Sequence, residues 1–169
     1  MKKKVQLLNF LIVVLLNTLF YNVRAAEVSD SIPSFKILLS NGTYYTRQDI
    51  PKRKPVILIY FSPDCEHCQK LLNSFFPRIK EFKNSEIVLV TFKTVDEVKT
   101  FEQQYQTYKY PNLVVGTEGN TYYLRYYYKL TNTPFTALYD KKGNMVYSYR
   151  KETPVTDLVQ RFKNMKALK

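Results

Sequence analysis

The sequence predicts an α/β protein with a central mixed sheet, helices on both faces of the sheet and a β-hairpin at its N-terminal end. Apolar runs typical of buried strands alternate with segments of helical periodicity, which is the pattern of a sheet covered by helices. Near the C-terminus a pair of strands and a last helix replace the alternation, so at least one strand must run antiparallel to the others.

The first elements are a hairpin and a buried strand. Residues 34–46 carry two short strand-like segments on either side of Asn41-Gly42, a dipeptide that favours the tight turn of a hairpin. The run VILIYF at residues 56–61 is continuous, apolar and rich in β-branched and aromatic side chains. Such a run is typical of a strand that is buried on both faces.

A helix, a strand and a second helix follow. Apolar residues recur at spacings of three and four from Cys68 to Phe82, which predicts a helix. Pro77 lies inside it, and we expect a break near Phe76 because proline removes a backbone donor and clashes with the preceding turn. Residues 87–92 predict the next strand, and Thr94-x-x-Glu97 resembles the capping box that starts a helix.

The second half of the chain continues with a short strand at residues 112–115. Residues 121–129 predict a helix, although their five tyrosines fit a strand as well. Residues 135–139 and 145–149 predict a hairpin, and a last helix begins at Thr153-Pro154, since proline is favoured at the first helical position. The order is therefore hairpin, then β-α-β-α-β-α-β-β-α, in one domain.

Residues 1–26 have the features of an export signal. Lys2, Lys3 and Lys4 form a positively charged start, an apolar run follows from Phe10 to Leu16, and Arg24-Ala25-Ala26 offers small residues for cleavage. Asparagines interrupt the apolar stretch, which falls short of the ~20 apolar residues of a spanning helix. We expect export to the bacterial periplasm and a mature domain at residues 27–169. An uncleaved membrane anchor is the alternative.

Composition disfavours several classes of function. The 169 residues hold 26 Lys and Arg against 14 Asp and Glu, a net charge of +12. Without Lys2, Lys3, Lys4 and Arg24 the expected mature domain keeps a charge of +8, which in an exported protein suits attraction to anionic surfaces, including a membrane surface, rather than nucleic-acid binding. The four glycines form no nucleotide-binding loop, and one His with two Cys cannot complete a four-ligand zinc site. We expect no cofactor and no bound metal, and the oligomeric state is left open.

The chemistry centres on Cys65-Glu66-His67-Cys68, where the first buried strand gives way to the first long helix. Two thiols three residues apart on a helical turn lie on one face, close enough to form a disulfide. Unpaired N–H groups and the positive end of the helix dipole stabilise a thiolate at the first position. We predict that Cys65 is the nucleophile and the more buried Cys68 the resolving thiol. An inert disulfide is the alternative, although a bridge enclosing two residues stabilises a fold little.

Here the sequence resembles the thioredoxin superfamily, and within it the exported thiol-disulfide oxidoreductases similar to TlpA and ResA. The resemblance covers about residues 34–162 and rests on the strand that leads into the cysteine motif and on Thr133-Pro134 before an apolar strand. In that superfamily a cis-proline faces the cysteine pair and lines the substrate groove, which implies this place for Thr133 and Pro134. His67 is similar to the histidine of DsbA-type oxidants, which helps to stabilise the first thiolate. A solvated helix residue is the other interpretation.

The resemblance implies a thioredoxin-like fold and an enzyme that exchanges disulfides, with protein thiol or disulfide substrates and a redox partner protein. Thioredoxin and ResA-like proteins carry an acidic residue near the cysteine pair, but the two corresponding positions here hold Ile59 and Leu71. No proton acceptor for Cys68 is therefore assigned. A peroxidase would need Pro-x-x-x-Thr/Ser-x-x-Cys, in which Ser62 fits but Leu58 replaces the proline. A copper-handling module using soft thiolates and a redox-inactive binding domain remain alternatives. Whether the pair reduces, oxidises or isomerises depends on its reduction potential.

Overall fold

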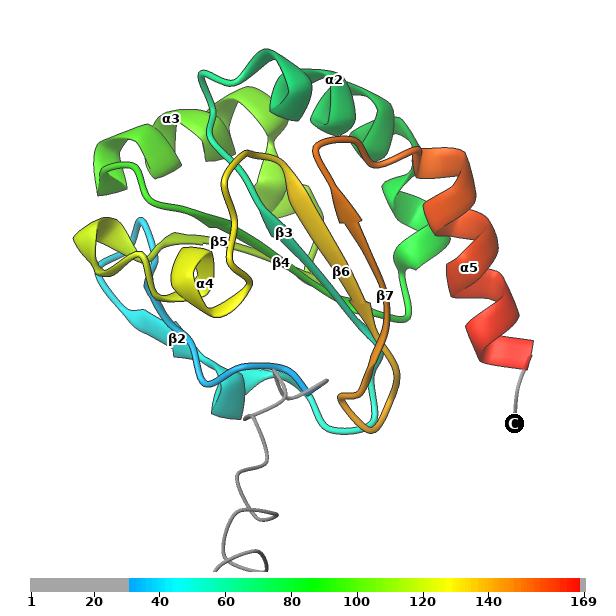
Figure 1. Cartoon of the computed structure of the whole chain (residues 1–169). Coiled ribbons are helices and arrows are strands. Elements are labelled where there is room, and N and C mark those ends of the chain that lie inside the picture. The colour runs from blue at the N-terminus through cyan, green and yellow to red at the C-terminus, as the bar shows by residue number, and fades with distance from the viewer. Residues whose placement is uncertain (1–30, 168–169) are drawn as a thin grey trace, which may run out of the picture.

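The computed structural model describes residues 31–167, arranged as one mixed sheet with helices packed against it (Figure 1). The strands are β1 (Lys36–Leu38), β2 (Tyr44–Thr46), β3 (Val56–Tyr60), β4 (Glu86–Thr91), β5 (Leu113–Thr117), β6 (Phe135–Tyr139) and β7 (Met145–Arg150). The helices are α2 (Glu66–Phe75), α3 (Val95–Tyr105), α4 (Tyr123–Tyr127) and α5 (Val155–Ala167). The predicted α/β fold class is confirmed. The expected export signal lies outside the described residues.

The sheet is seven-stranded, in the order β2-β1-β5-β4-β3-β6-β7. Strands β3, β4 and β5 run parallel at its centre, while β6 pairs antiparallel with β3 and then with β7. All residues of β3 and β4 are buried, as the continuous apolar runs predict. Among residues 31–167, no helix combines the length and the hydrophobicity needed to cross a membrane.

Two apolar clusters cover the two faces of the sheet. One contains side chains of α2, α3 and α5, including Leu72, Phe101 and Phe162, packed against alternate residues of β3 and β4. The other contains Leu124 and Tyr128 from the α4 region together with the N-terminal hairpin. Helices therefore lie on both faces, and the central strands are held between them.

Local sequence signals explain where the elements start and stop. α2 ends at Phe75, and a 3-10 segment, η2 (Phe76–Phe82), carries Pro77 in its first turn, so the predicted break is confirmed. Thr94 and Glu97 form the predicted capping box at the start of α3. Gly42 adopts φ = 82° in the turn between β1 and β2, a left-handed conformation that glycine reaches without steric cost.

The tyrosine-rich segment is a helix, α4, which is shorter than the expected range of residues 121–129. Leu124 and Tyr128 lie four residues apart and are both buried, whereas Tyr126 is 74% exposed. In a strand, Tyr126 would lie on the same face as Leu124 and Tyr128, so an exposed Tyr126 between two buried neighbours fits a helix instead. The strand alternative for this segment is therefore wrong.

Candidate active site

Cys65 lies at the junction between β3 and α2. β3 ends at Tyr60, and Cys65 is the residue immediately before the first turn of α2, with an extended backbone (φ = −89°, ψ = 119°). Its amide N–H donates to Ser62 O at 3.2 Å, and its carbonyl accepts the first helical hydrogen bond from Gln69 at 2.9 Å. The buried strand and the helix start thus fix the backbone of Cys65 at a helix N-terminus.

A polar contact holds the loop that precedes the first cysteine. Ser62 Oγ donates to Asp64 Oδ1, and Asp64 Oδ2 lies 2.7 Å from Lys93 Nζ. Hydrogen bonds from Lys93 and Ser62 lower the pKa of the Asp64 carboxyl despite a small opposing effect of desolvation. The negative charge next to Cys65 is therefore partnered by a cation.

The two thiols occupy different environments, as predicted. Cys65 is partly exposed and Cys68 is fully buried within the apolar cluster beneath α2. Partial burial opposes ionisation of Cys65, but hydrogen bonds from the Thr133 side chain, from Cys68 and from the His67 amide outweigh it and lower the pKa of Cys65. Burial raises the pKa of Cys68 to about 12. Of the two thiols, Cys65 is therefore the one that ionises more readily.

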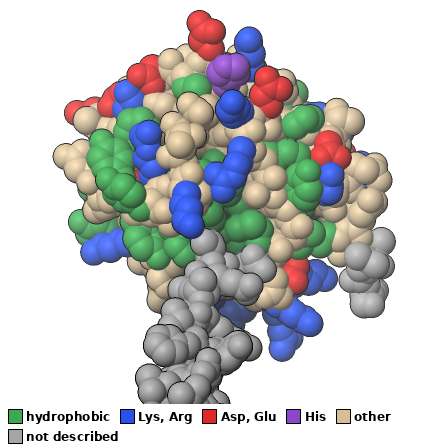
Figure 2. Space-filling model, viewed as in Figure 1, with side chains coloured by type: hydrophobic (Ala, Val, Ile, Leu, Met, Phe, Trp, Pro, Cys, Tyr) green, Lys and Arg blue, Asp and Glu red, His purple; other side chains and the backbone are tan. Residues whose placement is uncertain are grey.

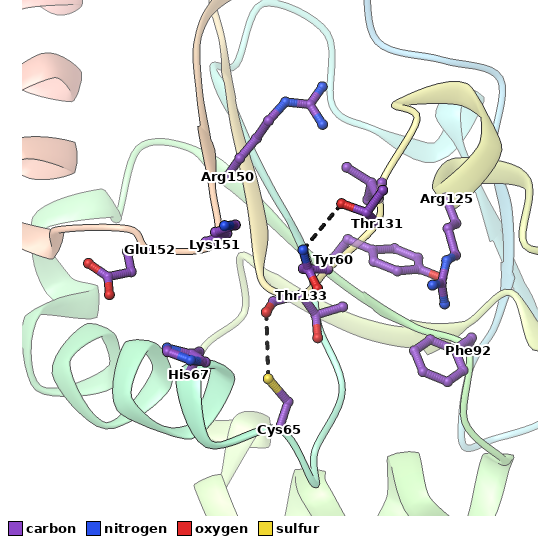
Figure 3. Close-up of a pocket in the computed structure, with 12 residues that line it drawn as sticks. Tyr60, Cys65, His67, Phe92, Arg125, Thr131, Thr133, Arg150, Lys151 and Glu152 are labelled. Carbon is purple, nitrogen blue, oxygen red and sulfur yellow. Dashed lines mark hydrogen bonds between the residues drawn. The ribbon is translucent and has the colours of Figure 1, made fainter.

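Thr133, which precedes Pro134, lies beside Cys65 although it is 68 residues away in the chain. β6 begins at Phe135 and pairs with β3 so that Phe135 lies opposite Tyr60, which brings the start of β6 next to the end of β3. Cys65 Sγ lies 3.6 Å from Thr133 O, a contact drawn as a dashed line in Figure 3. The Thr133–Pro134 peptide bond is cis, which is the geometry that the resemblance implied.

His67 is exposed in the first turn of α2 and lines the same pocket as Cys65. Its backbone amide is one of the groups that lower the pKa of Cys65. Between the described residues, no hydrogen bond joins the His67 ring to Cys65 Sγ. The contribution of residue 67 in this geometry is therefore that of its N–H group, which any residue except proline supplies.

Beside Cys65 lies a cavity of about 700 Å³ that the sequence did not reveal. Its other lining residues come from the ends of β3 and β4, from α4 and from the segments around β6 and β7: Tyr60, Phe92, Arg125, Leu130, Thr131, Asn132, Thr133, Arg150, Lys151 and Glu152. Figure 3 shows the labelled members arranged around Thr133. These residues lie in separate segments and form no motif in the sequence. The pairing of the strands brings them together.

Among the described residues, no acidic side chain forms a hydrogen bond with Cys68. Ile59 and Leu71, at the positions where relatives carry acidic residues, are both buried members of the apolar cluster that contains Cys68. The polar contact to its sulfur comes from the Ser62 amide, at 3.5 Å from Cys68 Sγ. Within residues 31–167, no group of three or more His, Cys, Asp and Glu side chains could hold a metal ion.

The sequence profile of the AhpC/TSA family matches residues 28–163. The chain belongs to the AhpC/TSA family. This family and the structural neighbours place it in the thioredoxin superfamily, as the cysteine motif and Thr133-Pro134 predicted, and family membership indicates a redox activity. A search of curated proteins finds no match.

Several solved structures share the fold of this AhpC/TSA protein. The exposed lipoprotein thioredoxin of Streptococcus pneumoniae is 22% identical, with a TM-score of 0.59 over 78% of this chain and 99% of that chain. A thiol-disulfide oxidoreductase of Bacteroides fragilis is 15% identical, with a TM-score of 0.61 over 80% and 98%. A peroxiredoxin-like protein of Aquifex aeolicus is 14% identical, with a TM-score of 0.67 over 84% and 89%. At these identities the likeness shows a thioredoxin-like fold.

Proposed function

We propose that this protein is an exported thiol-disulfide oxidoreductase, similar to TlpA and ResA, that exchanges disulfides through Cys65 and Cys68. One observation carries the proposal: the partly exposed thiol with the lowered pKa lies 3.6 Å from Thr133 O, while the second thiol is buried with its pKa raised to about 12. This asymmetry is what a nucleophile and a resolving thiol require.

The exchange needs two thiol-disulfide steps. The Cys65 thiolate attacks one sulfur of a partner disulfide, forms a mixed disulfide and releases the other partner sulfur as a thiolate, which takes up a proton. Cys68 then loses its proton and attacks Cys65 Sγ, which releases the second partner thiol. Two electrons pass from the chain to the partner, the partner disulfide is reduced, and a Cys65–Cys68 disulfide forms. The reverse sequence oxidises a partner dithiol.

Export supports this function because an oxidising compartment lets a dithiol cycle through its disulfide. The Lys-rich start, the apolar run and the small residues at the end of residues 1–26 are the basis for placing the protein in the bacterial periplasm. In that compartment its substrates are protein thiols or disulfides, and a redox partner protein restores the reactive state of the pair.

Trapping of the mixed disulfide tests the roles of the two cysteines. Cys68→Ser removes the resolving attack and leaves the helix N-terminus and the neighbours of Cys65 in place, so adducts through Cys65 should accumulate and disappear on reduction. Cys65→Ser is the matched control and should trap far less, because Cys68 is fully buried. Equal trapping by both variants would contradict the assigned roles.

Two other results would overturn the proposal altogether. A chain whose cysteines trap no partner and do not react with small disulfides would be a redox-inactive binding domain. Stoichiometric retention of Cu(I) by the pair, without disulfide exchange, would identify a copper-handling module that uses two soft thiolates. Purified chain, reduced and then incubated with a peptide disulfide or with Cu(I), distinguishes these cases directly.

A further inference from the structure

The pocket beside Cys65 carries a positive charge that disulfide exchange itself does not use. Arg125, Arg150 and Lys151 line it, with Glu152 as the one carboxylate. Between residues 31 and 167, none of these three cations lies within 4.0 Å of a carboxylate oxygen. Lys93, the cation beside Asp64, is by contrast ion-paired at 2.7 Å. The pocket therefore offers positive charge that is available to a ligand.

Arg150 is held in position without being neutralised. Its Nη2 donates to Tyr128 O at 2.9 Å, and its guanidinium carbon lies 5.4 Å from the centre of the Phe135 ring. A carbonyl and a ring face orient the guanidinium but leave its full charge. An arginine has five N–H donors, so donors remain for a carboxylate after the bond to Tyr128 is made.

Lys151 is fixed by its backbone next to the segment that contacts Cys65. Its amide N–H donates to Pro134 O at 3.1 Å, and its φ is 70°, a left-handed conformation that residues with a Cβ rarely adopt. This bond extends the pairing of β6 with β7 by one residue beyond the pair Phe135–Arg150. The backbone hydrogen bond to Pro134 therefore fixes the position of the residue that carries this positive charge.

The three cations lie around the pocket that Cys65 borders. In Figure 3 the guanidinium group of Arg150 lies beyond Thr133 as seen from Cys65, and that of Arg125 lies to the right of Thr133, above Phe92. Glu152 lies toward the His67 side, away from both guanidinium groups. Figure 2 shows several Lys and Arg side chains below the single histidine on this face.

We propose that the substrate of this site is a protein segment in which acidic residues flank the cysteine that reacts with Cys65. The proposal rests on the proposed function and adds the chemical class of its substrate. A cavity of about 700 Å³ is large enough for a short stretch of polypeptide. Carboxylates on that stretch meet Arg150 and Lys151 on one side and Arg125 on the other, which raises the rate of encounter and fixes the orientation of the segment.

Matched peptide disulfides test this inference with the reduced full-length chain. Three peptides of equal length carry one cysteine, bound as a disulfide to a small neutral thiol, and differ only in having Asp, Asn or Lys beside that cysteine. Each rate constant is divided by the rate constant of 2-mercaptoethanol with the same peptide, because neighbouring charges change the reactivity of the peptide thiol itself. We expect the normalised rate to be about three- to tenfold higher for the Asp peptide than for the Asn peptide.

Charge-reversal variants separate the pocket from the overall charge of the chain. Lys151→Glu should shift the preference toward the Lys peptide, and Arg150→Gln should lower the ratio of Asp to Asn rates. Lys142→Glu makes the same charge change in the turn at the opposite end of β6 and should leave the order of the peptides unchanged. The preference for Asp should also shrink as the salt concentration rises from ~0.05 M to ~1 M.

The outcomes distinguish this inference from the function on which it rests. Equal normalised rates for the three peptides, with all of them faster than 2-mercaptoethanol, would overturn the acidic substrate and leave the oxidoreductase intact. A shift caused by Lys142→Glu as large as that caused by Lys151→Glu would also overturn it. Reaction no faster than 2-mercaptoethanol with every peptide would refute the proposed function, and the substrate class with it.

Discussion

Replacing each cysteine in turn leaves a chain with one thiol, and the two chains should differ greatly in reactivity. Cys65→Ser leaves Cys68, whose pKa burial raises to about 12 against an ordinary value of 9.0. Cys68→Ser leaves Cys65, whose pKa is lowered and whose sulfur borders a cavity. The prediction is that the folded Cys65→Ser chain reacts slowly with a small disulfide, and the folded Cys68→Ser chain reacts fast.

The expected size of the difference follows from ionisation. A pKa about three units above the ordinary value lowers the thiolate fraction of Cys68 at neutral pH by a factor of about 10³. A thiolate of higher pKa is a better nucleophile, and a Brønsted coefficient of about 0.45 recovers a factor of about 20. Cys68 should therefore react about 50-fold more slowly than an ordinary thiol. Loss of Cys65 removes two smaller contributions to the raised pKa, while complete burial of the sulfur slows the reaction further.

Stopped-flow reaction with a small neutral disulfide such as dithiodipyridine measures both rates as a function of pH. The rate of Cys68 should rise about tenfold per pH unit through pH 10, because its thiolate is still a minor species there. The rate of Cys65 should level off once the pH exceeds its lowered pKa. Each chain unfolded in guanidinium is its own control. A folded Cys65→Ser chain that reacts within about fivefold of its unfolded control would refute the assignment of Cys68 as a shielded resolving thiol.

Three further substitutions probe other parts of the structure. Thr133→Val keeps the backbone carbonyl that contacts Cys65 Sγ and removes only the hydroxyl, whose interaction with the thiol lowers its pKa, so it should raise the pKa of Cys65 and slow exchange at pH 7 by a factor of about 2 to 10, measured by alkylation kinetics. His67→Ala keeps the amide that bonds Cys65, so the pKa of that thiol and the reduction potential should stay nearly unchanged; a clear rise in the pKa of Cys65 would show that the imidazole ring also stabilises the thiolate. Gly116→Ala would bring a Cβ within 2.9 Å of Ile37 Cδ1 and should lower the free energy of unfolding by about 1–3 kcal/mol in a denaturant titration.

Much of the fold could be read from neighbouring residues because its signals are local. The turn at Asn41-Gly42, the break at Pro77 and the capping box at Thr94 each depend on the backbone preferences of a few residues. The tyrosines of residues 121–129 were ambiguous because aromatic side chains suit both helix and strand. Packing decided that case, since the cluster on one face of the sheet takes up Leu124 and Tyr128.

The cysteine part of the candidate site could also be predicted from neighbouring residues. The cysteine motif sits at the start of a helix, and that position alone predicts which thiol ionises and which is buried. The proton acceptor of Cys68 was not predicted, and the structure explains why: the side chains at residues 59 and 71 are apolar and buried beside it.

The sequence by itself determined the order of the elements, the helix N-terminus that activates Cys65 and the burial of Cys68, because these follow from contacts within a few turns of chain. Only the tertiary structure decided that Thr133 contacts Cys65 and that Arg125, Arg150 and Lys151 line one pocket. These residues come from separate elements, and the antiparallel pairing of β6 with both β3 and β7 brings them together. A contact between residues 68 positions apart depends on how a sheet is ordered, which no local preference encodes.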